Sequence, residues 1–166
     1  MTDVEIFLEE PRDAEAISVL YDRAFGPGRF TRTAYRIREG SKFQTELSLA
    51  ARSKSNGSIT GTLRFSAILV GGKPGALLLG PLAVDPTSVG EGTGRALVKE
   101  GLSRVCSKGY RLVVLVGDLD YYKPLGFVQT HPWQLLFPGP VDPMRVLAYE
   151  CQEGVLENYS GLVIAI

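Results

Sequence analysis

Residues 82–97 read LAVDPTSVGEGTGRAL, and the order of residue types in this stretch indicates how the chain is built. An apolar strand ends at Val84, and three alternate glycines then lead directly into helical spacing. The glycines are Gly90, Gly92 and Gly94. Glycine lets a backbone come close to a ligand, and the start of a helix leaves N–H groups unpaired at its positive end. The stretch therefore predicts a site suited to a phosphate or pyrophosphate group.

The helix that follows the glycines is expected to run to Lys108-Gly109, where a glycine can adopt the left-handed conformation that ends it. One face carries small and apolar residues at helical spacing: Gly94, Val98, Gly101, Leu102 and Val105. Leu112–Val116 is a continuous apolar run, typical of a strand buried on both faces. A strand, a crossover helix and a second strand form a βαβ unit, so we expect the two strands to run parallel.

The N-terminal region predicts one strand and two helices. The strand is expected at Val4–Leu8, and Pro11-Arg12-Asp13 then opens a helix with Asp13 as its cap. Gly26-Pro27-Gly28 ends that helix. A basic amphipathic helix is expected from about Thr31 to Arg38, within a cluster of basic residues that suits either a solvated face or an acidic partner.

The middle of the chain predicts a meander of antiparallel strands. Turn signals at residues 55–58 and 71–75 separate expected strands at Glu46–Ala51, Ile59–Val70 and Ala76–Val84. Together with the βαβ unit, these strands predict a mixed α/β fold. Its central sheet should be mostly antiparallel, contain one parallel pair, and be flanked by helices.

Residue counts narrow the class of protein. The chain has 166 residues, 45% apolar and 22% charged, which suits a single domain over residues 1–166 with a sizeable core. Eighteen basic residues balance eighteen acidic ones, which argues against a nucleic-acid partner. A single histidine argues against a metal site. Two cysteines are too few for a disulfide framework, so Cys106 and Cys151 are expected as free thiols of a cytoplasmic protein. No apolar run approaches the roughly 20 residues that span a bilayer, so no membrane contact is expected.

Known phosphate-binding motifs fit the glycines poorly. A Walker-type loop needs a lysine and a hydroxyl residue after its last glycine, and neither is present. A dinucleotide fingerprint needs a further glycine at the position that Arg95 occupies. Taken alone, the glycines are also compatible with a plain turn.

Three segments in the right order resemble the GNAT superfamily of N-acetyltransferases. Gly92 and Gly94 match the two small positions of its acetyl-CoA motif. The segment Gly80–Val84 resembles the strand that lies along the pantetheine arm of CoA, and Tyr122–Phe127 resembles the late Tyr-x-x-x-Gly-Phe motif. The resemblance implies a GNAT fold, acetyl-CoA as acyl donor, no metal, and either a small-molecule amine or a protein lysine as acceptor.

The resemblance also implies which residues bind the donor. They lie on the strand and the glycine loop: Leu82, Ala83, Val84, Val89, Gly90, Glu91, Gly92, Thr93, Gly94 and Arg95. The strand residues should pair with the pantetheine amides, and the loop amides should hold the pyrophosphate. A bulge in the strand should splay it from Leu112–Val116 and open a slot for the acyl group.

Two positions depart from the family pattern. Val89 stands where glutamine or arginine is usual, and Glu91 places a carboxylate beside the expected pyrophosphate. Arg95, Lys99 or Arg104 would offset that charge in part. We expect donor binding that is weaker than typical.

The implied chemistry is direct attack of a primary amine on the thioester. The family's general acid corresponds to Tyr122, whose neutral phenol can protonate the leaving thiolate. Asp118 is the first candidate for the general base, ahead of Asp120, Glu46 and His131. Tyr121 is expected to serve packing or substrate contact.

Other readings of the residues stay open. Val89, Glu91 and the uncertain base also suit a non-catalytic acyl-CoA-binding module. The basic cluster also suits an enzyme that uses a longer acyl-CoA or an acyl carrier protein as donor. The apolar C-terminus, Gly161–Ile166, is expected either as a docked last strand or at a homodimer contact.

Overall fold

The computed structural model describes residues 3–26 and 43–166. The strands in chain order are β1 Val4–Leu8, β2 Leu49–Ser53, β3 Ile59–Val70, β4 Lys73–Val84, β5 Leu112–Val116, β6 Val128–Gln129, β7 Leu135–Leu136, β8 Val146–Glu150 and β9 Gly161–Ala165. The α-helices are α1 Ala14–Phe25, α3 Thr93–Ser107 and α4 Leu119–Tyr122. Short 3-10 turns are η1 Pro11–Asp13, η3 Pro86–Ser88, η4 Lys123–Leu125, η5 Pro143–Arg145 and η6 Val155–Asn158.

The strands form a sheet in the order β1-β2-β3-β4-β5-β8-β6, with β9 beside the end of β3 and β7 beside β9. Neighbours along the main path are antiparallel except β4 and β5. These two strands run parallel, and α3 connects them along the chain. The predicted mixed α/β fold, with its mostly antiparallel sheet and one βαβ unit, is therefore confirmed.

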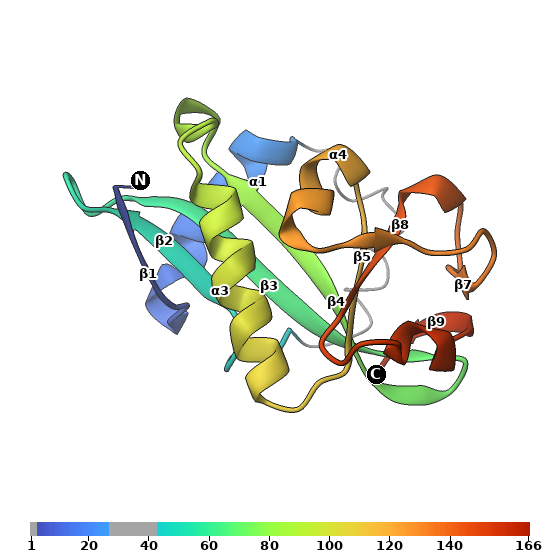
Figure 1. The fold of residues 1–166 in the computed structure, drawn as a ribbon. Coiled ribbons are helices and arrows are strands. Elements are labelled where there is room, and N and C mark those ends of the chain that lie inside the picture. The colour runs from blue at the N-terminus through green and yellow to red at the C-terminus, as the bar shows by residue number, and fades with distance from the viewer. Residues whose placement is uncertain (1–2, 27–42) are drawn as a thin grey trace.

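Helices cover the two faces of this sheet. Figure 1 shows α3 in front of β2, β3 and β4, and α1 behind them. Two glycines let α3 approach the sheet closely: a Cβ at Gly101 would lie 2.9 Å from Leu63 and Phe65, and one at Gly61 would lie 2.9 Å from Leu97 and from the helix start. The main apolar core lies at this contact.

Several expected elements need correction or cannot be compared. The strand predicted from Glu46 begins at Leu49, because residues 45–47 form a turn in which the Leu47 N–H donates to the Gln44 carbonyl at 2.9 Å. Asp13 does not cap α1 with its side chain; its carboxylate accepts from the Glu10 N–H at 2.9 Å and from Arg52. The helix predicted at 31–38 and the basic cluster lie outside the described residues.

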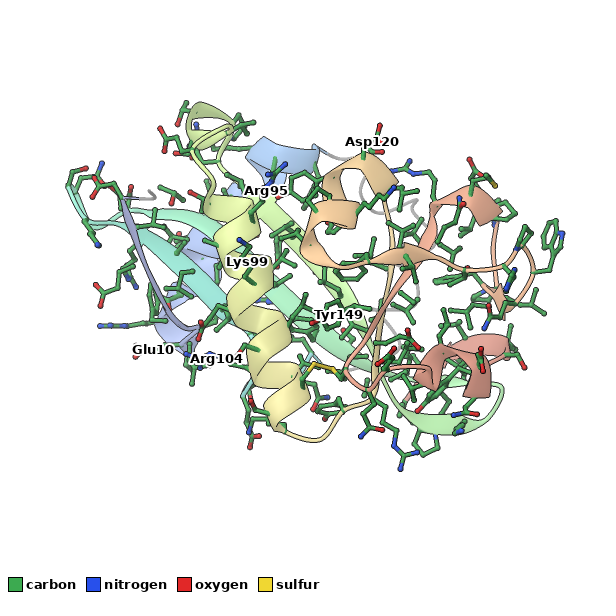
Figure 2. The ribbon with its side chains drawn as sticks, viewed as in Figure 1. Glu10, Arg95, Lys99, Arg104, Asp120 and Tyr149 are labelled. Carbon is green, nitrogen blue, oxygen red and sulfur yellow. A yellow bond between two sulfur atoms is a disulfide. The ribbon has the colours of Figure 1, made fainter. Side chains whose placement is uncertain are left out.

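The expectation of free thiols is wrong. Cys106, near the end of α3, forms a disulfide with Cys151, which follows β8 (Figure 2). The chain turns from α3 into β5, the Cys151 N–H donates to the Arg111 carbonyl at 2.9 Å, and the two Cα atoms are 5.2 Å apart. Two cysteines are too few for a disulfide framework but sufficient for one bridge, so the cysteine content no longer supports a reducing compartment.

The C-terminus forms a docked last strand, as one of the two expectations had it. β9 pairs antiparallel with β3 from Ile68 to Val70 and parallel with β7. In the part of the chain that the structure describes, no helix combines the length and the apolar character that a membrane crossing requires.

Candidate functional site

The glycine loop forms a tight turn from β4 into α3. Asp85 starts it by accepting the N–H of Thr87, and η3 follows. Gly90 and Gly92 adopt φ angles of 91° and 87°, a left-handed conformation that L side chains rarely take. Gly92 is the N-cap of α3, so the first-turn N–H groups emerge where the loop ends. These amides give the loop the partial positive charge that suits an anionic group.

The loop amides are not equivalent. The Glu91 N–H donates to the Ser88 carbonyl at 3.4 Å, which ties it to the turn itself. Thr93, Gly94 and Arg95 make up the first helical turn, whose N–H groups have no partner within a helix. The amides that are not tied back to the turn in this way therefore run from Gly92 to Arg95.

The side chains around the loop divide into buried and exposed sets. Thr93 is buried against Gly61, so the backbone of Thr93, and not its side chain, faces the loop. Val89 is 70% exposed, and Glu91 and Arg95 are also exposed. The carboxylate of Glu91 is therefore solvated and does not fill the turn.

Of the three basic residues expected to offset Glu91, only Arg95 lies in the first turn of α3. Figure 2 shows Arg95, Lys99 and Arg104 spaced along the helix, with Arg104 toward its far end. Arg104 pairs with Glu100 at 2.8 Å. Arg95 lies with its guanidinium carbon 5.7 Å from the centre of the Tyr121 ring, and of the three residues it is the nearest to Glu91 along the chain.

The strand that leads into the loop has one edge released from the sheet. β4 pairs with β3 as far as Val84, but it pairs with β5 only from Ala76 to Leu78. Between the Leu63–Leu82 and Phe65–Leu79 pairs, β4 has one residue more than β3, which is the predicted bulge. The predicted splay of β4 from β5 is thereby confirmed, and Leu82–Val84 carry backbone groups along the released edge.

Tyr121 and Tyr122 extend from α4, just after β5, to the two sides of this splay. A Cβ at Gly94 would lie 2.5 Å from the Tyr121 hydroxyl, so Tyr121 packs on the first turn of α3. Tyr122 packs on Gly117, and its ring lies edge-on to Phe127 at 5.4 Å. Burial raises the pKa of both phenols, with Tyr121 adding to the effect on Tyr122. Both are therefore neutral and able to donate a proton at neutral pH.

The carboxylates and the histidine considered as bases occupy different places. Asp118 directly follows the β5–Gly117 segment, is exposed, and accepts the Asp120 N–H at 3.4 Å as the N-cap of α4. Glu46 bonds Lys108 at 2.8 Å at the far end of α3, which lowers the pKa of Glu46. His131 is exposed in the segment after β6. Asp120 is also exposed and directly precedes Tyr121, so Asp118 and Asp120 are the two candidates that share α4 or its N-cap with the tyrosines.

The chain is similar in sequence and in fold to known proteins. The chain is 32% identical over 161 residues to the N-acetyltransferase YhbS of Escherichia coli K12, a match that covers 95% of this chain and 93% of YhbS. The crystal structure of E. coli YhbS, a GNAT family N-acetyltransferase in complex with CoA, matches with a TM-score of 0.83 and 30% identity, over 100% of this chain and 91% of that one. The chain belongs to the GNAT family of N-acetyltransferases.

A second GNAT structure agrees. The GNAT family acetyltransferase of Brucella melitensis in complex with acetyl-CoA is 33% identical, with a TM-score of 0.64 over 90% of this chain and 97% of that one. No protein-family model matches the chain. Among the described residues, no group of three or more histidine, cysteine, aspartate or glutamate side chains is placed to hold a metal ion.

Two features of the site were not predicted from the sequence. One is the packing of Tyr121 on Gly94, which depends on where α4 meets α3 and leaves no local pattern in the sequence. The other is the role of Asp85, although an aspartate that follows a strand and directly precedes a proline is typical of a turn.

Proposed function

We propose that this GNAT protein transfers an acetyl group from acetyl-CoA to a primary amine by direct attack. The observation that carries the proposal is the released edge of β4, which leads through two left-handed glycines into the open first turn of α3. An extended amide chain suits the strand edge, and a pyrophosphate suits the helix start. A molecule of CoA has both parts in this order.

Donor binding follows from those backbone groups. The main chain of Leu82, Ala83 and Val84 would hold the pantetheine arm, and the amides from Gly92 to Arg95 would hold the pyrophosphate. Gly94 favours this arrangement, because a Cβ at this position would lie 2.5 Å from the Tyr121 hydroxyl. Glu91 weakens the binding by repulsion, while the exposed Val89 and Gly90 leave the mouth of the loop open.

Tyr122 is the proposed general acid. When bound, acetyl-CoA supplies an activated acyl group, and the amine nitrogen forms the new bond to the acyl carbon as the carbon–sulfur bond breaks. Tyr122 gives its proton to the departing sulfur. Because burial raises the pKa of Tyr122, the phenol is protonated at neutral pH and carries the proton that the leaving thiolate requires.

The cysteines favour direct attack over an acyl-enzyme route. The chain has two cysteines, and both are held in the disulfide between α3 and the end of β8. A thiolate nucleophile would need a free, activated cysteine. Direct transfer to the amine needs none.

Asp118 is the proposed general base, and the variant that tests it is Asp118→Asn. Asparagine is as good an N-cap as aspartate, so α4 is kept while the proton acceptor is removed. Loss of turnover at pH 7 with recovery at higher pH, where the amine arrives neutral, would support the role. Unchanged turnover at both pH values would remove it and point to water.

The first experiment is thermal unfolding with and without saturating acetyl-CoA, with ATP and NADH as controls. A ligand at about 100 times its Kd stabilises the folded state by about 2.7 kcal/mol, which raises the Tm of a domain of this size by about 5–10 °C. A selective rise with acetyl-CoA supports the proposal, and a screen of small amines and lysine peptides with thiol-release detection then identifies the acceptor.

Other results would point to the alternatives. Stabilisation by acetyl-CoA without turnover on any amine would indicate a binding module. Stabilisation only by longer acyl-CoAs, or acyl transfer only from a carrier protein, would change the donor. No stabilisation by any acyl donor would contradict the proposal.

A further inference from the structure

Asp85 connects three parts of the fold at the start of the glycine loop. Its carboxylate accepts the Thr87 N–H at 2.9 Å and the Thr87 hydroxyl at 2.7 Å, and it forms an ion pair with Arg23 of α1. Its own N–H donates to the Thr60 carbonyl of β3 at 2.8 Å. The residue is only 8% exposed. The two bonds from Thr87, with a contribution from Arg23, lower the pKa of Asp85, so the carboxylate is charged at neutral pH.

A series of hydrogen bonds continues from Asp85 to the glycines. The Ser88 N–H donates to the Asp85 carbonyl at 2.8 Å, and the Glu91 N–H donates to the Ser88 carbonyl at 3.4 Å. Gly92 follows and begins α3. The position of the loop is thus fixed, step by step, from a side chain of α1.

Few other restraints on the loop come from the part of the chain that the structure describes. Val89, Gly90, Glu91 and Gly92 are all exposed there, so none of the described residues fixes their positions by apolar packing. A segment with few buried contacts samples other conformations unless specific bonds restrain it, and a ligand must then offset the cost of ordering it. The restraint at Asp85 therefore bears directly on how well the loop is prepared for a ligand.

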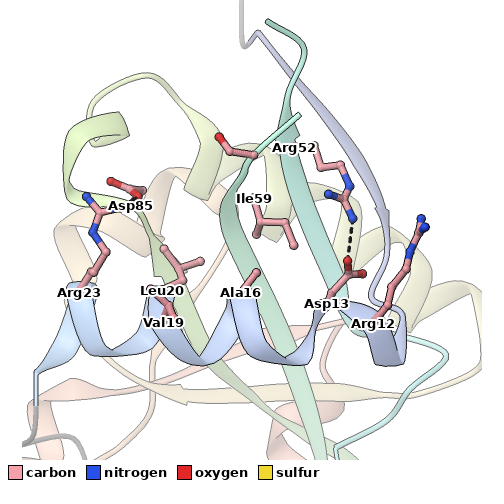
Figure 3. Close-up of a pocket in the computed structure, with 10 residues that line it drawn as sticks. Arg12, Asp13, Ala16, Val19, Leu20, Arg23, Arg52, Ile59 and Asp85 are labelled. Carbon is pink, nitrogen blue, oxygen red and sulfur yellow. Dashed lines mark hydrogen bonds and ion pairs between the residues drawn. The ribbon is translucent and has the colours of Figure 1, made fainter. Parts of the chain in front are cut away.

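The same face of the molecule contains a second ion pair of the same kind. A groove of about 600 Å³ runs between α1 and the strand ends, with an apolar floor that includes Leu20 and Ile59 (Figure 3). Arg23–Asp85 stands at one end and Arg52–Asp13 at the other. Because each of these arginines is already neutralised by an aspartate, the groove needs no bound anion to explain its charges. The Arg52 pair makes no contact with the loop and serves as a matched control.

We propose that Arg23 is a positioning residue for the acyl donor: acting through Asp85, it holds the glycine loop in the conformation that receives the pyrophosphate. The inference rests on the proposed function. It makes α1, on the opposite face of the sheet from α3, part of the donor-binding apparatus. Arg23 itself does not touch the donor, so its loss affects donor affinity and leaves the chemical step intact.

The test compares Arg23→Gln with Arg52→Gln. Calorimetry gives the Kd of acetyl-CoA, and steady-state kinetics at saturating amine separate the donor KM from kcat. We expect Arg23→Gln to raise both the Kd and the donor KM about 3- to 5-fold, the size of one partly exposed ion pair, with kcat unchanged. We expect Arg52→Gln to lower the Tm while leaving the Kd within experimental error.

A double-mutant cycle shows whether Arg23 acts through Asp85. Asp85→Asn retains an oxygen that accepts from Thr87 but loses the charge, so it should weaken donor binding about as much as Arg23→Gln. The double variant should then be no weaker than either single one, and Arg23→Lys should recover part of the affinity. Additive effects would overturn the coupling.

The outcomes separate this inference from the proposed function. If the wild-type protein binds acetyl-CoA and the two arginine variants have the same Kd, the positioning role is wrong and the proposed function stands. If the wild-type protein does not bind acetyl-CoA, both are overturned.

Discussion

At the scale of single residues, two adjacent tyrosines show how one short motif serves two ends of a site. Tyr121 extends to Gly94 in the first turn of α3, while Tyr122 packs on Gly117 and on Phe127. Their rings lie edge-on, with centres 4.8 Å apart. Each ring therefore restrains the other. A substitution at one position is an informative control for the other, because the two rings contact each other but pack against different elements.

Tyr122→Phe should lower kcat by about 100-fold, because general-acid catalysis typically contributes at least that much. The Kd of acetyl-CoA should stay unchanged, since the substitution removes one oxygen and leaves the ring packing intact. Tyr121→Phe is the matched control and should retain most of the turnover. Equal kcat values for the wild-type protein and Tyr122→Phe would remove the assignment.

The raised pKa of Tyr122 makes a prediction about pH. The acid must be protonated to act, and a phenol loses its proton only as the pH rises through its pKa. Because burial moves that pKa above the usual value of about 10, kcat should not fall on the alkaline side between pH 7 and about 9.5. The measurement is kcat against pH at saturating substrates. An alkaline decline centred below pH 9 that disappears in Tyr122→Phe would contradict this.

Gly94→Ala tests the close approach at the helix start. A Cβ there would lie 2.5 Å from the Tyr121 hydroxyl. Overpacking of this kind costs about 1–3 kcal/mol, which exceeds the gain of at most about 1 kcal/mol from replacing glycine in a helix. We therefore expect a lower Tm and weaker acetyl-CoA binding.

Tyr121→Phe should rescue Gly94→Ala, because the remaining contacts of that Cβ are at ordinary distances, 3.4 Å to Val84 and 3.8 Å to the tyrosine Cζ. The measurement is the free energy of unfolding of the two single variants and the double variant. If the double variant is as unstable as Gly94→Ala alone, the close contact is not the cause.

At the scale of elements, regular features were predictable and tertiary ones were not. The strand at Ile59–Val70 and the βαβ unit follow from apolar periodicity and from glycines at turns, and both are present. Asp13 stands at the N-cap position of α1 as predicted, but its carboxylate accepts the N–H of Glu10, three residues earlier, instead of an N–H of the helix. The ion pair of Arg23 with Asp85 spans 62 residues and leaves no local pattern in the sequence.

The candidate site also combines parts that the local sequence predicts with parts that depend on tertiary contacts. Its backbone parts, the bulged strand and the glycine loop, depend on local residue types, so the motif located them. The roles of individual side chains depend on which elements meet, as Tyr121 and Gly94 do. Arg104 shows what residue type alone does not predict. Its charge suggested that it could offset Glu91 as Arg95 could, but it pairs with Glu100 toward the far end of α3.

The disulfide makes a prediction about α3 as an element. It closes a segment whose ends are 45 residues apart in sequence, and chain-entropy estimates for a loop of this length give about 4 kcal/mol of stabilisation. Reduction, or Cys106→Ser, should therefore lower the Tm by about 10 °C. Cys151→Ser should match Cys106→Ser, and reductant should have no effect on either variant. Identical melting of the oxidised and reduced wild-type protein would contradict a stabilising bridge.

At the scale of the whole molecule, two apolar cores lie along one sheet. One core lies between α3 and the sheet, beside the proposed donor site. The other gathers Ile68, Tyr159 and Val163 where β9 meets β3, and it closes the end of the sheet away from the glycine loop. On this arrangement we expect the C-terminal strand to contribute to stability, and the loop and the tyrosines to the proposed function. Damage to β9 should affect folding without changing the affinity of the folded protein for acetyl-CoA.

Val163 and Ile164 test this division, because they are neighbours in β9 with opposite orientations. Val163 is fully buried, and Ile164 is 40% exposed. Val163→Asp would place an unpaired charge in the second core and should lower the free energy of unfolding by more than about 3 kcal/mol, whereas Ile164→Asp should change it by at most about 0.5 kcal/mol. Denaturant unfolding at two protein concentrations measures both. A comparable loss in Ile164→Asp, together with a wild-type stability that rises with concentration, would show instead that a second copy of the chain covers the outer side of β9, which is the homodimer contact given as the alternative for the apolar C-terminus.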